Sequence, residues 1–469
     1  MTPLAHDLAR LLGPEALRTG PEYLHDMTEM QRLGGTADAV VAPANVEQIQ
    51  ALVAWCYRHG VAMVPRGGGT GFAGGAVPAG GVVCSLERLG AVRRFEPERW
   101  RVQVDAGVTT GAVHRLARES GLFYGPDPGA AEQSQIGGNV ACNAGGPHSF
   151  KYGVTREWVM SLEVVVSGGR LMTLGGALRK DVAGYDLTSL MVGSEGTLGI
   201  ITGAWLRLLP APEVAWPMVA AYPDRSAGAA AVRQLYGSGL VPAILEYVDE
   251  GAVDASRASF PAGLPDDARF LVIVEADGCR SAAEELSDGL RAALEPGALL
   301  LQTYPEAASA RQLWRWRNGL SFAVMAQRGG KMSEDVAVPV ECLEEALELT
   351  SRIGAEVGLP TCSWGHAGDG NLHATFMIDP SDPADLVRAR RGIEALFAGV
   401  LGLGGTITGE HGVGLVKRDF LYGQLGEPQM ELQRSIKRLF DPANLFNPGK
   451  KIVAGPEARP DPGTPSSTR

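Results

Sequence analysis

Two short glycine-bracketed segments late in the chain carry the residues best suited to chemistry. Residues 365–373 read GHAGDGNLH and hold His366 and His373, while residues 408–412 read TGEHG. A histidine beside glycines has few packing neighbours of its own, so its imidazole is better explained by chemistry than by bulk. The Gly-Asp-Gly turn at 368–370 can fold the first segment into a hairpin and bring its two histidines across from one another.

The second segment adds a carboxylate, Glu410, and a third imidazole, His411. If Glu410 joins His366 and His373, the set has two imidazoles and one carboxylate. Such a facial set suits Zn²⁺, Mn²⁺ or Fe²⁺ and leaves coordination positions open for a substrate. His411 would then be available as a general base. The alternative is a hydrogen-bonded polar turn without metal, in which His411 is only a structural neighbour.

Composition narrows the class of protein that must position these groups. The 469 residues are 45% hydrophobic and 20% charged, which predicts two or three domains with sizeable cores. The formal net charge of −11, with no run of Lys or Arg, argues against nucleic acid or an anionic membrane surface as a partner. We expect no signal peptide and no membrane span, because no basic region precedes an apolar core and no apolar run is long enough.

Cysteine usage bears on the compartment. Six cysteines are scattered along the chain without a C-x-x-C pair. They are typical of small buried apolar residues in a reducing cytosol. We therefore expect a cytoplasmic protein.

The pattern of expected strands and helices along the chain predicts an α+β fold with several parts. Strands near 218–222, 244–248 and 270–275 alternate with longer helices near 227–236 and 282–294, which predicts antiparallel strands with helices on one face. The expected parts are a helical lead-in (1–34), a first domain (35–213), a second domain (214–452) and a disordered tail (453–469).

The first domain delivers a glycine loop at 65–75 directly from a strand at 61–64. Residues 69–74 match G-x-G-x-x-G, but the chain continues through further glycines into another strand, so no helix can open there as a Rossmann fold requires. Consecutive glycines can still turn several backbone N–H groups inward and bind phosphate without a helix.

Two further glycine-rich blocks follow, at 125–146 and 192–201. The first of these almost lacks charge, so a large flat ring could lie against its backbone. The side chains of Gln135 and Asn143 offer amide groups to the polar edges of such a ring.

The three glycine blocks, the two histidine segments and a closing segment at 441–450 occur in an order that resembles one family. The chain resembles FAD-linked oxidases of the vanillyl-alcohol-oxidase/PCMH superfamily. It is most similar to the D-2-hydroxy-acid dehydrogenase group, which includes D-lactate dehydrogenase, D-2-hydroxyglutarate dehydrogenase and the glycolate oxidase flavoprotein subunit. The resemblance covers nearly all of 35–452. It implies a PCMH-type FAD-binding domain of two α+β subdomains, then an α+β cap domain with an antiparallel sheet, whose end returns to the flavin.

The resemblance also implies roles for individual residues. Thr70 stands where relatives with covalently attached flavin carry a histidine, so we expect non-covalent FAD. The metal ligands would be His366, His373 and Glu410, and the base His411. Arg317 and Lys331 resemble positions that bind the substrate carboxylate. The cofactor-binding residues would be Pro65, Arg66, Gly67, Gly68, Gly69, Thr70 and Gly71 around the pyrophosphate, Asp127, Gln135, Ile136, Gly137, Gly138, Asn143 and Asn447 around the flavin, and Glu195, Gly199 and Ile200 near the adenylate.

The expected activity is oxidation of a D-2-hydroxy acid of the D-lactate, glycolate or D-2-hydroxyglutarate type to the 2-oxo acid. Hydride would pass to FAD, assisted by the metal and the histidine base. The partners would be an electron acceptor (a quinone, a cytochrome or an electron-transferring flavoprotein) or a partner subunit, with a homodimer as one possible assembly. The alternatives are a flavin-dependent transferase of the alkylglycerone-phosphate synthase type, or a subunit active only within an electron-transfer complex.

Overall fold

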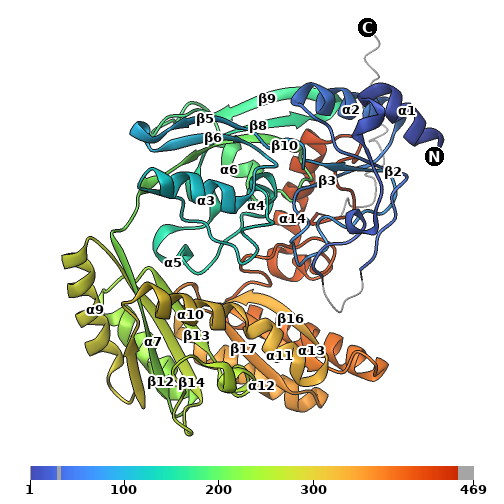
Figure 1. Ribbon diagram of the computed structural model, residues 1–469. Helices are drawn as coiled ribbons and strands as arrows, with labels where there is room; N and C mark the ends of the chain where they lie inside the picture. The colour runs from blue at the N-terminus through green and yellow to red at the C-terminus, as the bar shows by residue number, and fades with distance from the viewer. Residues whose placement is uncertain (1, 29–32, 453–469) are drawn as a thin grey trace.

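The computed structural model describes residues 2–28 and 33–452, which form two lobes (Figure 1). We call residues up to 213 the N-terminal lobe and residues 214–420 the C-terminal lobe. The tail expected to be disordered, 453–469, lies outside the described residues. No helix in the described part of the chain has both the length and the apolar character needed to cross a bilayer.

The N-terminal lobe begins with a small sheet that sets up the first glycine loop. Its strands run in the order β1-β2-β4-β3, with β2, β4 and β3 parallel. The lead-in begins with a helix, but residues in its middle form β1, which pairs with β2, so it is not purely helical. The elements are α1 (Pro3–Leu12), β1 (Leu17–Arg18), β2 (Ala39–Val41), α2 (Val46–His59), β3 (Met63–Arg66) and β4 (Val82–Ser85).

Helix α2 shows why the local sequence folds as it does. The Asn45 side chain caps the helix by accepting the Gln48 N–H at 2.9 Å. The helix ends at Gly60, whose φ of 64° is the left-handed conformation that glycine adopts without strain. Its apolar face packs in the hydrophobic core that also holds β2, β3 and β4.

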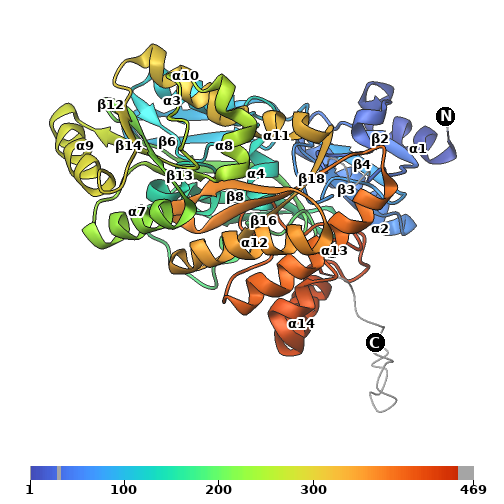
Figure 2. The same ribbon diagram turned by 90° about the horizontal axis from the view of Figure 1, so that it is seen from below.

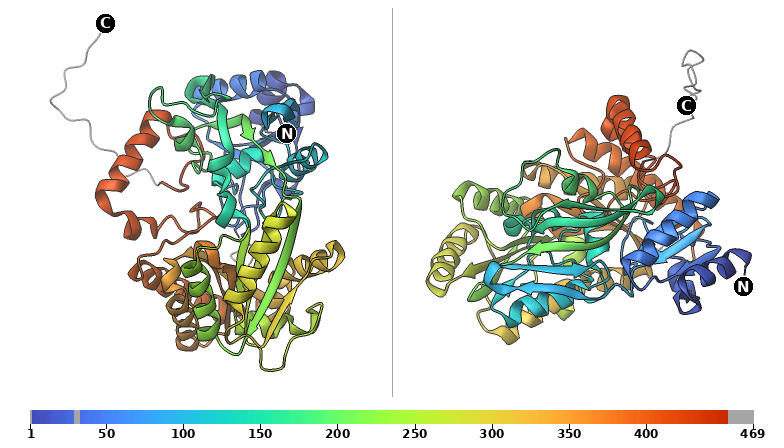
Figure 3. Two further views of the ribbon diagram at one scale, coloured as in Figure 1. Left: turned by 90° about the vertical axis from the view of Figure 1, so that its left-hand side faces the viewer. Right: turned by 90° about the horizontal axis from the view of Figure 1, so that it is seen from above.

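A second, five-stranded antiparallel sheet completes the N-terminal lobe in the order β5-β6-β10-β8-β9 (Figure 3, right). Strands β8 and β9 form an antiparallel hairpin at one edge of this sheet. Helices α3 and α4 pack against this sheet's core. The elements are β5 (Val92–Glu96), β6 (Arg101–Asp105), α3 (Thr110–Glu119), β7 (Leu122–Phe123), α4 (Ile136–Cys142), α5 (Ser149–Tyr152), β8 (Val159–Val166), β9 (Arg170–Gly175), α6 (Leu187–Met191), β10 (Ile200–Arg207) and β11 (Leu209–Pro210).

The C-terminal lobe is built on a seven-stranded, fully antiparallel sheet in the order β15-β12-β14-β13-β17-β18-β16. The α+β class with an antiparallel cap sheet is thus confirmed. The strands are β12 (Val214–Tyr222), β13 (Ile244–Val248), β14 (Phe270–Gly278), β15 (Leu300–Thr303), β16 (Gly330–Ala337), β17 (Thr361–His366) and β18 (Asn371–Ile378).

Helices cover both faces of this sheet, so the expectation of helices on one face is wrong (Figure 2). The physical reason is visible in β14 and β18, which are buried along almost their whole length and need apolar cover on both sides. One face carries α7 (Arg225–Ser238), α9 (Arg280–Leu294), α12 (Leu343–Val357) and α13 (Pro383–Gly402), and the other α8 (Glu250–Ser256), α10 (Ala307–Asn318) and α11 (Leu320–Arg328).

The chain then returns to the N-terminal lobe through α14 (Leu421–Phe440), which runs along the side of the molecule (Figure 3, left). Its first part packs in the C-terminal core through Leu421, whereas its end packs against the five-stranded sheet through Phe440. Beyond the helix, Phe446 forms a bridge to Met63 of β3. The C-terminal segment therefore closes over the first glycine loop.

Candidate active site

The hairpin β17–β18 places both candidate histidines on one face of the C-terminal sheet. A short 3₁₀ turn (Ala367–Asp369) and Gly370, with φ of 64°, connect the strands. The predicted hairpin is therefore confirmed, with one difference in register. His366 pairs with Asn371, and His373 pairs with Trp364, so the two imidazoles are diagonal neighbours rather than directly opposite.

Glu410 lies against both imidazoles. Its Oε1 atom is 3.5 Å from His366 Nε2 and 3.7 Å from His373 Nε2. The two rings are nearly perpendicular, with centroids 5.5 Å apart. One possible ligand atom from each residue lies within 4.8 Å of the other two. The structure thus brings together the three residues predicted as metal ligands, in a set whose donor chemistry fits Zn²⁺, Mn²⁺ or Fe²⁺.

The electrostatics of the set give Glu410 and His373 protonation states that bind a metal. Burial would lower the pKa of His366, but Glu246 and Glu410 outweigh burial and raise it well above its ordinary value, so a cation would have to displace a proton from His366. Burial would raise the pKa of Glu410, but His366, His373 and His411 lower it to about 2. Burial lowers the pKa of His373 to about 3 against the smaller opposing effect of Glu410. At neutral pH the carboxylate is ionised and this imidazole is neutral, which are the states that coordinate a cation.

A buried carboxylate orients His366 from behind. Glu246 of β13 is fully buried, and its Oε1 pairs with His366 Nδ1. Its Oε2 accepts a hydrogen bond of 2.6 Å from Arg317 Nε of α10. Burial would raise the pKa of Glu246, but Arg317 and His366 hold it below its ordinary value. Because Nδ1 is held by Glu246, Nε2 of His366 is the atom that faces Glu410, as in carboxylate–histidine–metal arrangements.

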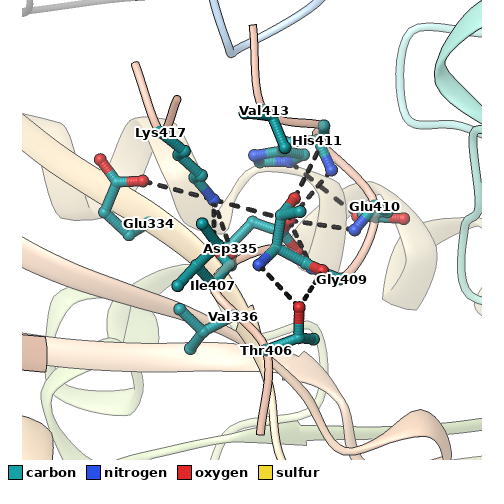
Figure 4. A network of polar contacts seen from close by, with 12 residues as sticks. Glu334, Asp335, Val336, Thr406, Ile407, Gly409, Glu410, His411, Val413 and Lys417 are labelled. Atoms are coloured by element: carbon teal, nitrogen blue, oxygen red, sulfur yellow. Dashed lines mark hydrogen bonds and ion pairs between the residues drawn. The ribbon is translucent and has the colours of Figure 1, made fainter. Parts of the chain in front are cut away.

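Asp335 of β16 organises the loop that carries Glu410 and His411 (Figure 4). Its carboxylate is buried, and it lies directly across the sheet from His373. The amide of Asn371 donates to its Oδ1 at 2.6 Å. Its Oδ2 accepts the backbone N–H groups of Gly409, Glu410 and His411 at 2.9, 3.0 and 3.0 Å, and the Thr408 hydroxyl at 2.8 Å.

Lys417 ties the far end of the same loop to β16. Its buried ammonium donates to the carbonyl oxygens of Asp335 at 2.6 Å and Ile407 at 2.9 Å, and lies 3.4 Å from Glu334 Oε2. Burial would raise the pKa of Asp335, but interactions with His411 and Lys417 hold it well below its ordinary value. The loop is therefore clamped at both ends by groups on a single strand.

The two predicted carboxylate-binding cations lie on opposite sides of this cluster. Lys331 shares the face of β16 that carries Asp335, and its Nζ donates to Ser333 Oγ at 3.0 Å and lies 5.8 Å from the Trp364 ring centroid. Arg317 instead has its guanidinium on Glu246. The structure therefore gives Arg317 a role in positioning Glu246 that the sequence did not suggest.

The three glycine blocks converge in the N-terminal lobe. A Cβ on Gly67 would come within 3.4 Å of the Gly138 backbone, and one on Gly68 would meet the Gln133 carbonyl oxygen at 2.1 Å. The third block packs against Pro65, because a Cβ on Gly196 would lie 3.2 Å from the proline ring. The three blocks therefore pack together through backbone and small residues, and we call them the glycine cradle.

Two observations test whether this cradle fits FAD. Within the described residues, the N–H groups of residues 67–71 donate no hydrogen bond, which matches a nest for phosphate. The Gln135 Oε1 atom is buried and also lacks a hydrogen-bond partner among the described residues, which matches an acceptor for a polar ring edge. Residues 67–71 would hold the pyrophosphate and Gln135 an edge of the ring system.

The other predicted cofactor residues have identifiable local roles. Asn143 is the left-handed C-cap of α4 and accepts the Arg156 N–H at 2.9 Å. Ile136 and Ile200 point into hydrophobic cores, so only their backbone could face a ligand. Gly137 and Gly199 pack closely against Ala106 and β8.

The two charged residues predicted to contact the cofactor have partners within the protein. Arg66 donates to the carbonyl oxygens of Glu22 and His25 at 2.6 and 2.8 Å. Asp127 pairs with His148 at 2.6 Å.

Asn447 and Glu195 join the cradle to the histidine loop. The Asn447 side chain donates to the carbonyl oxygens of Gly75 and Glu195 at 2.9 and 2.8 Å. The Glu195 carboxylate accepts the backbone N–H groups of Val413 and Gly414 at 3.0 and 2.7 Å. The loop bearing Glu410 and His411 is therefore held by both lobes.

Further contacts lock the lobes together beside the site. His148, which precedes α5, has its Nε2 3.4 Å from Glu275 Oε1 of β14. Lys151 and Tyr152 of α5 both pair with the buried carboxylate of Asp277 on the same strand. The candidate site thus lies at an interface built from charged pairs.

Sequence reasoning missed Glu246, Asp335 and Lys417. A lone acid inside the apolar run ILEYV of β13 was the available signal for Glu246, because a charge buried in a strand requires a partner. Asp335 alternates with Met332, Glu334 and Val336 along β16, which places it on the face of the sheet opposite to the apolar residues.

The role of Glu246 can be tested by its uncharged analogue. In Glu246→Gln the amide cannot supply the same charge to His366 Nδ1, so divalent-ion affinity is expected to fall about 10- to 100-fold. Competition with a metallochromic chelator measures this affinity. Glu275→Gln is the matched control, because Glu275 is a buried carboxylate on the same sheet face that pairs with His148 instead. Equal affinities in both variants would contradict the role of Glu246.

The comparisons with known proteins show the family to which the chain belongs. The model of the FAD linked oxidases, C-terminal domain, matches residues 211–451, and that of an FAD binding domain matches residues 37–175. The glycolate oxidase subunit GlcD of Bacillus subtilis is 36% identical over 433 residues, 92% of each chain. The D-lactate dehydrogenase of Anaerostipes hadrus is 33% identical over 96% of this chain and 97% of its own. The D-2-hydroxyglutarate dehydrogenase of Xanthomonas citri pv. viticola is 36% identical over 88% of each.

Solved structures support the fold. p-Cresol methylhydroxylase with substrate bound superposes with a TM-score of 0.77 at 18% identity, covering 96% of each chain. Alkyldihydroxyacetonephosphate synthase gives a TM-score of 0.75 at 18% identity, covering 96% of this chain and 85% of that one. The expectation of a PCMH-type FAD-binding fold is confirmed. The chain belongs to the FAD-linked oxidases and is an FAD-dependent oxidoreductase.

Proposed function

We propose that this oxidoreductase converts a D-2-hydroxy acid to the 2-oxo acid. The observation that carries the proposal is the cluster of His366, His373 and Glu410 beside His411, at the interface between the glycine cradle and the C-terminal sheet. The names of the relatives, which include D-lactate dehydrogenase and D-2-hydroxyglutarate dehydrogenase, support the same substrate class.

The residues of the cluster would bind and orient the substrate. His366, His373 and Glu410 would hold a divalent cation, of which Zn²⁺, Mn²⁺ and Fe²⁺ are the candidates. Such an ion, when bound, lowers the pKa of a coordinated hydroxyl group. Lys331 and Arg317 are our candidates for binding the substrate carboxylate, and Arg317 additionally holds Glu246.

His411 would act as the general base. It lies next to the ligand set, with Nε2 4.0 Å from Glu410 Oε1. It would take the proton of the 2-hydroxyl group as the hydrogen on C2 leaves with its electron pair. FAD, when bound in the cradle, supplies the acceptor for those two electrons. Loss of this proton and this hydride converts the C–OH group of the substrate to the C=O bond of the 2-oxo acid.

The electrons must then leave the protein. A quinone, a cytochrome or an electron-transferring flavoprotein could accept them, directly or through a partner subunit. Two relatives are named as subunits of glycolate oxidase, which supports a partner-dependent route. We propose a cytoplasmic protein, peripherally associated where the acceptor is in a membrane, with a homodimer as one assembly to test.

The substrate class is tested by anaerobic bleaching of the flavin. D-lactate, glycolate or D-2-hydroxyglutarate is expected to bleach the visible flavin band, while L-lactate and L-2-hydroxyglutarate are expected to leave it intact. The reason is that the ligand set and His411 present one fixed face to C2. Anaerobic absorbance titration at saturating acid measures the effect.

Prior removal of the divalent ion by a chelator is the paired control, and bleaching should be lost and then restored by added Zn²⁺ or Mn²⁺. A bound flavin that no hydroxy acid bleaches would contradict the proposal. That result would favour a transferase or a subunit that works only within a complex.

The base is tested by His411→Asn. Because the amide cannot accept the proton, flavin reduction is expected to slow by about 10² to 10⁴. Stopped-flow absorbance measures the rate, and bound metal is quantified in parallel. His59→Asn, which changes an exposed histidine of α2, is the control. Unchanged reduction in His411→Asn would exclude His411 as the base.

Flavin attachment is tested by denaturation. We infer non-covalent FAD, because Thr70 occupies the loop position and His148 pairs with Asp127 and Glu275. Acid precipitation is expected to release all of the flavin into the supernatant, as measured by its fluorescence. Flavin that stays with the precipitated polypeptide would contradict this inference.

A further inference from the structure

An aromatic ring from the N-terminal lobe lies on the imidazole of His411. Phe72 belongs to the first glycine loop, and its ring stacks on His411 with centroids 4.7 Å apart and planes 28° from parallel. The His373 ring lies 5.5 Å from His411 at 15°. His411 thus stacks with both rings: one from the flavin-binding loop, the other from the metal-ligand hairpin.

Backbone contacts fix the Phe72 segment to the loop that carries His411. The carbonyl oxygen of Ala73, the next residue, accepts the N–H groups of Leu415 and Val416 at 2.8 and 3.2 Å. A Cβ on Gly414 would meet the same carbonyl oxygen at 2.0 Å, so this approach requires glycine. The stacking is therefore built on a paired backbone and does not depend on one side-chain contact.

The backbone bonds to Asp335 do not determine the plane of the His411 ring. They hold the N–H of His411, whereas the imidazole can still rotate about its two side-chain torsions. Stacking partners restrict those rotations, because offset aromatic pairs prefer nearly parallel planes at this separation. An exposed large aromatic side chain, with 38% of Phe72 accessible, is otherwise unexplained in a loop of small residues.

We propose that Phe72 is a positioning residue that holds the His411 imidazole in the plane from which it takes the substrate proton. The inference rests on the proposed function for the proton transfer. The placement of the ring itself can be measured without turnover. A loop that holds the flavin would thereby also orient the base on the other lobe.

The test uses the FAD- and metal-loaded protein and three variants. Phe72→Leu keeps apolar bulk but removes the aromatic face, and Phe72→Tyr keeps that face. Tyr185→Leu, at an exposed tyrosine in the segment between β9 and α6, is the control. Without substrate, diethyl pyrocarbonate modification of His411 is followed by peptide mass spectrometry. The modification is expected to be faster in Phe72→Leu and unchanged in Phe72→Tyr and Tyr185→Leu.

The second readout separates chemistry from binding. In Phe72→Leu, the limiting rate of anaerobic flavin reduction is expected to fall about 10- to 100-fold, with less than about a twofold change in the half-saturating substrate concentration. Phe72→Tyr should keep the parent rate. Parent-like modification and reduction in Phe72→Leu would overturn the proposal.

Loss of bound FAD from both Phe72 variants would also overturn it, because Phe72 would then be a packing residue of the cofactor loop. If the parent protein itself reduced no flavin with any hydroxy acid, the proposed function would fail. The modification experiment would still decide whether Phe72 holds His411.

Discussion

The buried carboxylate of Asp335 is the interaction on which the candidate site depends. A carboxylate removed from water is costly unless its oxygens receive several donors, and here three consecutive backbone N–H groups, a hydroxyl and an amide supply them. The same bonds determine the path of residues 408–411, and so the positions of Glu410 and His411. Because Asp335 pairs across the sheet with His373, one side chain relates the loop to the ligand hairpin.

The two lobes meet where these groups lie, and each supplies part of the constraint. Asp335 and Lys417 hold the loop from the C-terminal sheet, while Glu195 holds residues 413 and 414 from the N-terminal lobe. The return of α14 brings Asn447 against the first and third glycine blocks. A relative shift of the lobes would therefore strain the site and the cradle together. Charge pairs such as Lys151–Asp277, whose carboxylate is buried, also join the lobes.

Local sequence patterns predicted the parts of the site that are close in sequence. The Gly-Asp-Gly turn defined the hairpin of His366 and His373, and continuation of the glycine loop into a strand excluded a Rossmann helix. Glu246 could not be assigned to His366 because 120 residues separate them, and Arg317 lies 71 residues beyond Glu246. Similarly, Arg317 resembles a carboxylate-binding residue in the sequence, but its pairing with the internal carboxylate of Glu246 was visible only in the structure. Such pairings follow from strand order, which the sequence of one chain does not display.

The central claim is that His366, His373 and Glu410 hold a divalent ion beside His411. It is tested most directly by anomalous X-ray diffraction from crystals of the purified protein, with data collected on either side of the Zn, Mn and Fe absorption edges. Our account predicts one edge-dependent peak within about 2.0–2.2 Å of both Nε2 atoms and a Glu410 oxygen. A fully loaded protein with its only anomalous peak elsewhere, or with none, would contradict the account.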